Sequence, residues 1–147
     1  MDNRGLSTVV EKVLSIGIVL LYVALLTTTL YGGAVPAYRS AVGAELGERT
    51  LAEATARIEQ AVPPSGRSVT ATYRVDLPAT IEGVAYEIRT DGGALVLVHP
   101  EEGVGGRTRP VLSDRVTALS GTWHSGEETV VTVGGGNGTV TVRLEEA

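Results

Sequence analysis

The stretch from Val13 to Tyr31 constrains the fold most, because its nineteen residues contain no charged side chain. An α-helix of that length would measure about 29 Å, close to the roughly 30 Å thickness of a bilayer's hydrocarbon core. The hydroxyl groups of Ser15 and of residues 27–29 can bond back to carbonyl groups one turn earlier. A buried core helix this long and apolar is unusual in a chain of 147 residues, so we expect the stretch to span a membrane.

Charged residues around this stretch predict how it is oriented. Arg4 and Lys12 precede it, whereas Arg39 is the only base that follows closely. The positive-inside rule therefore favours a cytoplasmic N-terminus and an exported C-terminal part. A cleaved secretory signal, with its shorter apolar core of about 7–15 residues, is the alternative. Cleavage after residues 32–34, Gly-Gly-Ala, would then leave Val35 as the first residue.

Composition excludes several classes of protein. The net charge is −5, and residues 61–147 carry eleven acids against seven bases, so no basic face for nucleic acid is expected. Many acids, a single lysine and no phenylalanine predict a salt-adapted, halophilic source with a GC-rich genome. Because the chain has no cysteine, disulfides and thiolate metal sites are impossible, and the exported part must be held together by its core.

A second helical segment is expected after the span. Pro36 removes a hydrogen-bond donor and crowds the preceding turn, which predicts a kink or a break there. Residues 37–62 return to a helical pattern, which stops at the Pro-Pro-Ser-Gly of residues 63–66. One face of this helix is predicted to be apolar, with Leu51, Ala54, Ile58, Ala61 and Val62 along it.

Everything after Gly66 has the alternating pattern of strands separated by turns. The predicted strands are Ser68–Leu77, Val84–Arg89, Ala94–His99, Arg115–His124, Thr129–Val133 and Thr139–Leu144. Residues 100–110 are expected to form a glycine-rich loop. An antiparallel sheet of short strands needs one face covered, and the amphipathic helix can cover it. The fold class is therefore α+β, a long N-terminal helix followed by a small antiparallel β head.

No pattern in the chain indicates catalysis, a metal site or a cofactor. The two histidines, His99 and His124, lack the spacing of metal ligands, and His99 is expected to be structural. Ser113 and Asp114 lie outside any nucleophile-elbow motif, and the glycine-rich run at residues 134–139 lacks the lysine of a phosphate loop. Asn137 begins the glycosylation sequon Asn-Gly-Thr in what we predict to be a hairpin turn.

The segment Arg4-Gly5-Leu6 and the Ser-Thr-Val-Val that follows resemble the processing site of archaeal type IV pilin-like precursors. In that family a base and a glycine precede the cut, and an apolar helix follows it. The resemblance implies that a prepilin peptidase removes residues 1–5 as a leader peptide on the cytoplasmic side. The mature chain would then begin at Leu6 and keep its helix.

Glu11 is the acidic residue nearest to the apolar stretch. Bacterial type IV pilins carry an acid at the fifth mature position, which pairs with the amino terminus of a neighbouring subunit. Counted from Leu6, Glu11 is the sixth residue, so the correspondence is displaced by one. Two interpretations stay open: a charge pair between subunits, or a solvated acid that marks the membrane boundary beside Lys12.

The predicted layout also resembles the type IV pilin plan, and residues 77–100 resemble the head of small haloarchaeal pilin-like proteins. The domains expected are a leader at 1–5, a pilin-type transmembrane helix at 6–34, an amphipathic helix at 35–64 and a β head at 65–147. The resemblance implies a non-enzymatic structural subunit of a surface filament or pseudopilus, with the membrane and other pilin-like subunits as partners. The alternative is a bitopic membrane protein whose exported β domain binds a partner and does not polymerise.

Overall fold

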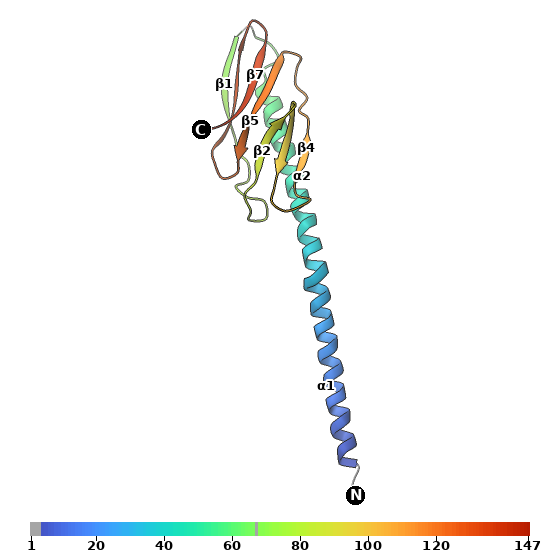
Figure 1. Ribbon diagram of the computed structural model, residues 1–147. Coiled ribbons are helices and arrows are strands. Elements are labelled where there is room, and N and C mark those ends of the chain that lie inside the picture. The colour runs from blue at the N-terminus through green and yellow to red at the C-terminus, as the bar shows by residue number, and fades with distance from the viewer. Residues whose placement is uncertain (1–3, 67) are drawn as a thin grey trace. The chain divides into compact units, whose positions relative to one another are not determined.

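A computed structural model describes the backbone of residues 4–66 and 68–147 and the side chains of residues 8–66 and 68–147. The chain divides into two compact units, Met1–Arg39 and Ser40–Ala147. Helical structure begins with α1, Arg4–Thr29, passes through the π-helical segment η1, Leu30–Ala34, and continues as α2, Val35–Ala61 (Figure 1).

Pro36 does not break the helix, although the sequence predicts a kink or break there. The five residues of η1 lie just before the proline, and the backbone N–H of Val35 donates to the carbonyl of Leu30. That bond spans five residues instead of four, which widens the turn immediately before the proline ring. The helix therefore departs from α geometry beside Pro36, as proline and π-bulges both cause, and then continues.

The second unit is a seven-stranded sheet with α2 on one face (Figure 1). Its strands are β1 Ser68–Val75, β2 Glu87–Asp91, β3 Ala94–Val98, β4 Gly106–Thr108, β5 Val116–His124, β6 Thr129–Gly136 and β7 Val140–Glu146. Their order across the sheet is β1-β6-β7-β5-β2-β3-β4. The prediction of an α+β fold with a long N-terminal helix and a β head is confirmed.

Two details of the predicted sheet are wrong. The pair β5 and β7 is parallel, because β7 turns back from β6 and lies between β6 and β5. The region 100–110 also contains the short strand β4, which pairs with β3. Alternation along a strand reports which side chains face the core, but it carries no information on neighbours, so the sheet is mixed where an antiparallel one was expected.

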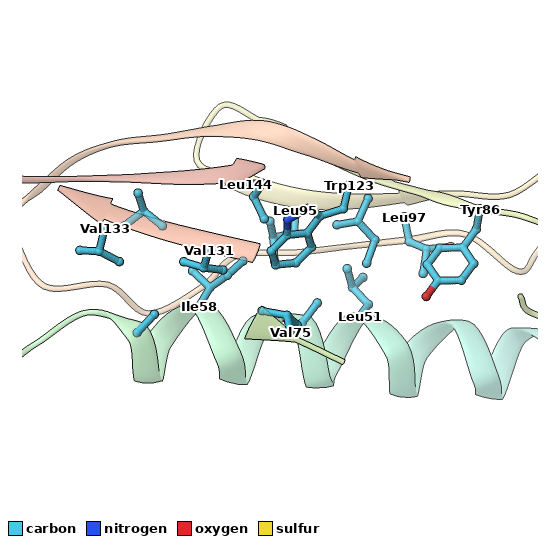
Figure 2. Packing of buried hydrophobic residues seen from close by; sticks show 14 of the residues in the cluster. Leu51, Ile58, Val75, Tyr86, Leu95, Leu97, Trp123, Val131, Val133 and Leu144 are labelled. Atoms are coloured by element: carbon cyan, nitrogen blue, oxygen red, sulfur yellow. The ribbon is translucent and has the colours of Figure 1, made fainter. Parts of the chain in front are cut away.

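The core forms between the apolar face of α2 and one face of the sheet (Figure 2). The predicted helix stripe is confirmed: Leu51, Ala54, Ile58 and Ala61 are buried, and Val62 packs against the cluster. From the strands, the core includes Val75 of β1 and Trp123 of β5, together with the alternate residues of β7 and inward residues of β2, β3 and β6: Val140, Val142, Leu144, Ile88, Leu95, Leu97, Val131 and Val133.

Two apolar residues that the alternation assigns to the core lie at the surface. Tyr73 in β1 keeps 46% of its surface exposed, and Val84 keeps 40%. β1 is an edge strand, so its side chains meet a neighbour on one side only. Val84 lies outside the strands, in a tight bridge with Ile81 that ends the loop before β2.

Candidate functional site

The surface of α1 and η1 is the first candidate site, because its apolar side chains are uncovered. Every residue from 8 to 34 is exposed, including Leu21 at 72% and Tyr31 at 69%. The helix is long and apolar enough to cross a membrane, and it lies near the N-terminus. An apolar surface of this extent needs lipid or other protein around it.

Threonines near the C-terminal end of α1 are accommodated within the helix. The side chains of Thr27, Thr28 and Thr29 each donate a hydrogen bond to the carbonyl four residues earlier, at 2.8, 2.8 and 2.9 Å. The predicted back-bonding of these threonines is confirmed. Their hydroxyl groups thus have partners inside the helix, which removes most of the cost of placing them in lipid.

The polar end of α1 holds the predicted processing and pairing residues. Arg4, Gly5 and Leu6 lie in the first turns of α1; their side chains, and residues 1–3 of the predicted leader, are outside the described residues. Glu11 and Lys12 are both exposed, and no ion pair within the described part of the chain involves Glu11. Its carboxylate is therefore available to a partner from outside the chain.

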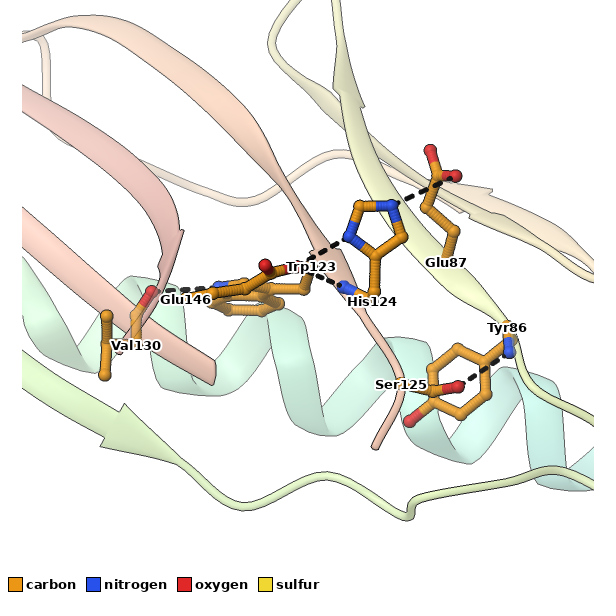
Figure 3. Close-up of polar contacts among 7 residues, drawn as sticks. All are labelled: Tyr86, Glu87, Trp123, His124, Ser125, Val130 and Glu146. Carbon is orange, nitrogen blue, oxygen red and sulfur yellow. Dashed lines mark hydrogen bonds and ion pairs between the residues drawn. The ribbon is translucent and has the colours of Figure 1, made fainter. Parts of the chain in front are cut away.

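A polar cluster in the head links three neighbouring strands (Figure 3). The ring of His124 in β5 lies between Glu146 of β7, with Nδ1 2.6 Å from Oε1, and Glu87 of β2, with Nε2 3.8 Å from Oε2. The backbone N–H of His124 also donates to Glu146 at 3.3 Å. The side-chain hydrogen bond to Glu146, followed by the charges of Glu146, Glu87 and Glu127, raises the pKa of His124. The same hydrogen bond lowers the pKa of Glu146.

We call this cluster of His124, Glu146 and Glu87 the clip, because it connects three strands. The two carboxylates contact different nitrogens of one ring, so they do not converge on a common point. No group of three or more His, Cys, Asp or Glu residues among the described ones is placed to hold a metal ion. Sequence reasoning missed the cluster, since residues 87, 124 and 146 are far apart in the chain and only the strand order joins them.

Below the clip, two buried aromatic residues hold the ends of strands together (Figure 3). The indole N–H of Trp123 donates to the carbonyl of Val130 at 2.8 Å. The hydroxyl group of Tyr86 donates to the carbonyl of Pro78 at 2.6 Å, and burial raises its pKa to about 12. The N–H of Tyr86 donates to the hydroxyl group of Ser125 at 2.8 Å.

An open cavity of about 210 Å³ lies over these aromatic residues. Its rim carries Arg74 and Glu128, which form an ion pair with each other, together with Asp76 and Glu127. Small-molecule sites usually enclose about 300–1,000 Å³. The cavity is smaller, and two of its charged lining groups, Arg74 and Glu128, are already paired with each other.

The other residues that the sequence singled out, His99, Ser113, Asp114 and Asn137, lie in loops and turns. His99 accepts a hydrogen bond at Nδ1 from the N–H of Glu101 at 3.1 Å, and its Nε2 lies 3.3 Å from the carbonyl of Ile81. It ties two loops, as expected of a structural histidine. Ser113 and Asp114 are exposed and share no hydrogen bond with either histidine in the described chain. Asn137 is exposed at the turn between β6 and β7.

The geometry therefore defines a class, a small α+β head on a helix that is able to cross a membrane. Residues 1–145 match the model of a family of unknown function, DUF7266, and the chain belongs to that family. No curated protein and no solved structure matches the chain.

Proposed function

We propose that this chain is a pilin-like structural subunit of a cell-surface filament or pseudopilus, held in the membrane by α1 before assembly. The observation that carries the proposal is the Arg4-Gly5 sequence at the start of α1, in a helical run whose apolar surface is exposed throughout residues 8–34 and that continues into α2. Such a helix is first an anchor in lipid and then an apolar rod that can pack with copies of itself. The Arg4-Gly5 sequence resembles the processing site of archaeal type IV pilin-like precursors, and this resemblance supports cleavage before Leu6.

The proposed topology follows from the same residues. Its N-terminus is cytoplasmic, where the peptidase acts, and the head lies outside the cell. In lipid, hydrophobic exclusion does not drive one helix onto another, so packing and polar pairing have to do so. Glu11 is exposed on α1 and unpaired in the described chain, so it can meet the new amino group of Leu6 on an adjacent subunit.

The second candidate is a bitopic anchor whose head binds a partner and does not polymerise. The full exposure of α1 favours neither candidate, because lipid alone can cover it. The two differ in their mature N-terminus and in where the chain is found.

The first test is the N-terminal sequence of the chain purified from membranes of cells that make it. We expect Leu6 as the first residue, and a retained Met1 would contradict the pilin class and support the simple anchor.

The second test compares Glu11→Gln with the unchanged chain in sheared surface filaments and in membranes. If Glu11 pairs with a neighbouring amino group, the variant is depleted from filaments while its processing and membrane level hold. Normal incorporation of the variant would contradict the pairing and leave the filament assignment standing.

A further inference from the structure

The hairpin between β6 and β7 ends in a tight turn at Asn137 and Gly138. Both residues have positive φ, +55° and +86°, and the N–H of Thr139 donates to the carbonyl of Gly136 at 3.2 Å. These are the features of a type I′ hairpin turn, for which Asn-Gly is the favoured pair. Turn chemistry therefore explains residues 137 and 138. It does not require a threonine at residue 139, which completes the sequon Asn-Gly-Thr.

The turn is held in place by side chains that donate hydrogen bonds to backbone carbonyl groups. Arg115 donates from Nε to the carbonyl of Gly138 at 3.0 Å and from Nη2 to the carbonyl of Gly66 at 2.5 Å. Thr139 Oγ1 also lies 3.1 Å from the carbonyl of Gly136 and donates to it. The side chain of Asn137, in contrast, is exposed and has no hydrogen-bond partner within the described residues. The side-chain amide of Asn137 is therefore exposed on a turn that hydrogen bonds hold in place, and it makes no hydrogen bond within the described residues.

Space around Asn137 is open. A Cβ atom added at Gly136 or Gly138 would meet no atom within 4 Å, so no side chain crowds the acceptor from either side. The turn lies beyond the pairing of Ser68 with Gly136, at the end of the sheet where α2 has already finished. A bulky group at this position would extend away from the core.

We propose that Asn137 is a site of N-linked glycosylation on the exported head. The inference rests on the proposed function in one respect, since the head must be outside the cell to meet the sugar donor. The reaction transfers a glycan from a lipid-linked sugar phosphate. The amide nitrogen of Asn137 forms a bond to the anomeric carbon, the bond from that carbon to the phosphate oxygen breaks, the lipid phosphate leaves, and the amide loses one proton to a base. Nothing is oxidised or reduced.

The test is mass spectrometry of the peptide containing Asn137, from the full chain purified from membranes of cells that naturally make it. We expect a sugar mass on Asn137 in the unchanged chain and in Thr139→Ser, which keeps the sequon. We expect none in Thr139→Ala or in Asn137→Asp. Aspartate tolerates positive φ, so Asn137→Asp keeps the turn while removing the acceptor nitrogen.

An unmodified asparagine at residue 137, or an aspartate formed by deamidation without any sugar, would overturn the proposal. A sugar that persists in Asn137→Asp would also overturn it, because it would have to lie elsewhere. The mature N-terminus of the same sample separates this proposal from the previous one. Leu6 with unmodified Asn137 contradicts glycosylation alone, whereas Met1 with a sugar on Asn137 contradicts the pilin assignment alone.

Discussion

At the scale of single residues, His124 shows how one side chain joins strands that are distant in sequence. Its ring Nδ1 donates a hydrogen bond to the carboxylate of Glu146 at 2.6 Å on one side, and its Nε2 faces Glu87 at 3.8 Å on the other. β5 pairs with β2 through only three residue pairs, one of which is Glu87 with His124. The clip therefore reinforces one of the two junctions of the sheet that have only three residue pairs. Because His124 and Glu146 are exposed and Glu87 is partly exposed, its contribution is that of a surface ion pair, which is usually small.

The clip predicts a defined pH dependence. The raised pKa of His124 means that its contribution is fully present below the unfolded pKa of about 6.5 and is lost as pH rises through the folded pKa. The lowered pKa of Glu146 means that its contribution is present above the unfolded value of about 4.5 and is lost as pH falls through the folded pKa. The clip is therefore strongest in mildly acidic solution, between those two values.

Titration of the imidazole by NMR checks this prediction. We expect His124 to titrate above 6.5 in the unchanged chain and closer to 6.5 in Glu146→Gln, because the hydrogen bond to Glu146 is the largest cause of the shift. Glu127→Gln is the control, since Glu127 acts only through its charge and contributes least. His124→Gln assigns the signal, as the chain has only two histidines. An equal effect of the two glutamate variants would contradict the geometry.

At the scale of elements, α2 packs closely against the rest of the head because two of its positions carry no side chain. Gly43 and Gly47 continue the buried stripe of Leu51, and both are buried themselves. A Cβ at Gly47 would collide with the backbone carbonyl oxygen of Val104. The two glycines weaken the helix by up to about 1 kcal/mol apiece, and in exchange the loop containing Val104 lies directly against it.

Gly47→Ala is therefore expected to destabilise the head. Alanine improves helix propensity by about 1 kcal/mol, and overpacking typically costs about 1–3 kcal/mol. Because the clash at Gly47 is a close one with backbone, we expect the upper part of that range and a net loss of up to about 2 kcal/mol. Denaturant unfolding of the full chain in detergent, followed by fluorescence of Trp123, measures it. Trp123 is the only tryptophan and is buried in the head, so the signal reports that unit.

Ala52→Gly is the matched control, because Ala52 is exposed on the same helix and loses only propensity, about 1 kcal/mol. Both variants should then unfold at lower denaturant concentration than the unchanged chain. If Gly47→Ala raises the midpoint instead, propensity alone governs residue 47. The close approach of the loop to α2 would then be contradicted.

Elements also show how far the sequence predicts this fold. Spacing along one helix is a local property, so the apolar face of α2, with Leu51, Ile58 and Ala61, is predicted correctly. The parallel pairing of β5 with β7 and the clip at His124 depend on which strands become neighbours, which no local pattern states. The role of Gly47 is equally hidden, because a glycine in a helix indicates either weakness or close packing until its partner is known.

At the scale of the whole molecule, the two compact units have opposite requirements. The apolar side chains of residues 8–34 are exposed, whereas the unit Ser40–Ala147 buries its apolar residues in its own core. Every buried side-chain nitrogen or oxygen among the described residues has a hydrogen-bond partner. The first unit therefore needs an apolar environment, and the second is complete without one.

A fragment of residues 40–147 is accordingly expected to fold in water as a soluble monomer. It keeps the helix face of Leu51 and Ile58 with the sheet that covers it, so it should unfold in one cooperative transition. Residues 61–147 carry eleven acids against seven bases, so salt that screens their repulsion should stabilise the fragment.

Sedimentation and denaturant unfolding across a range of salt concentrations measure whether the fragment is monomeric and whether it unfolds cooperatively. The full chain is the control and should require detergent or lipid to stay dispersed. A fragment that aggregates or lacks cooperative unfolding at every salt concentration would contradict a self-sufficient head.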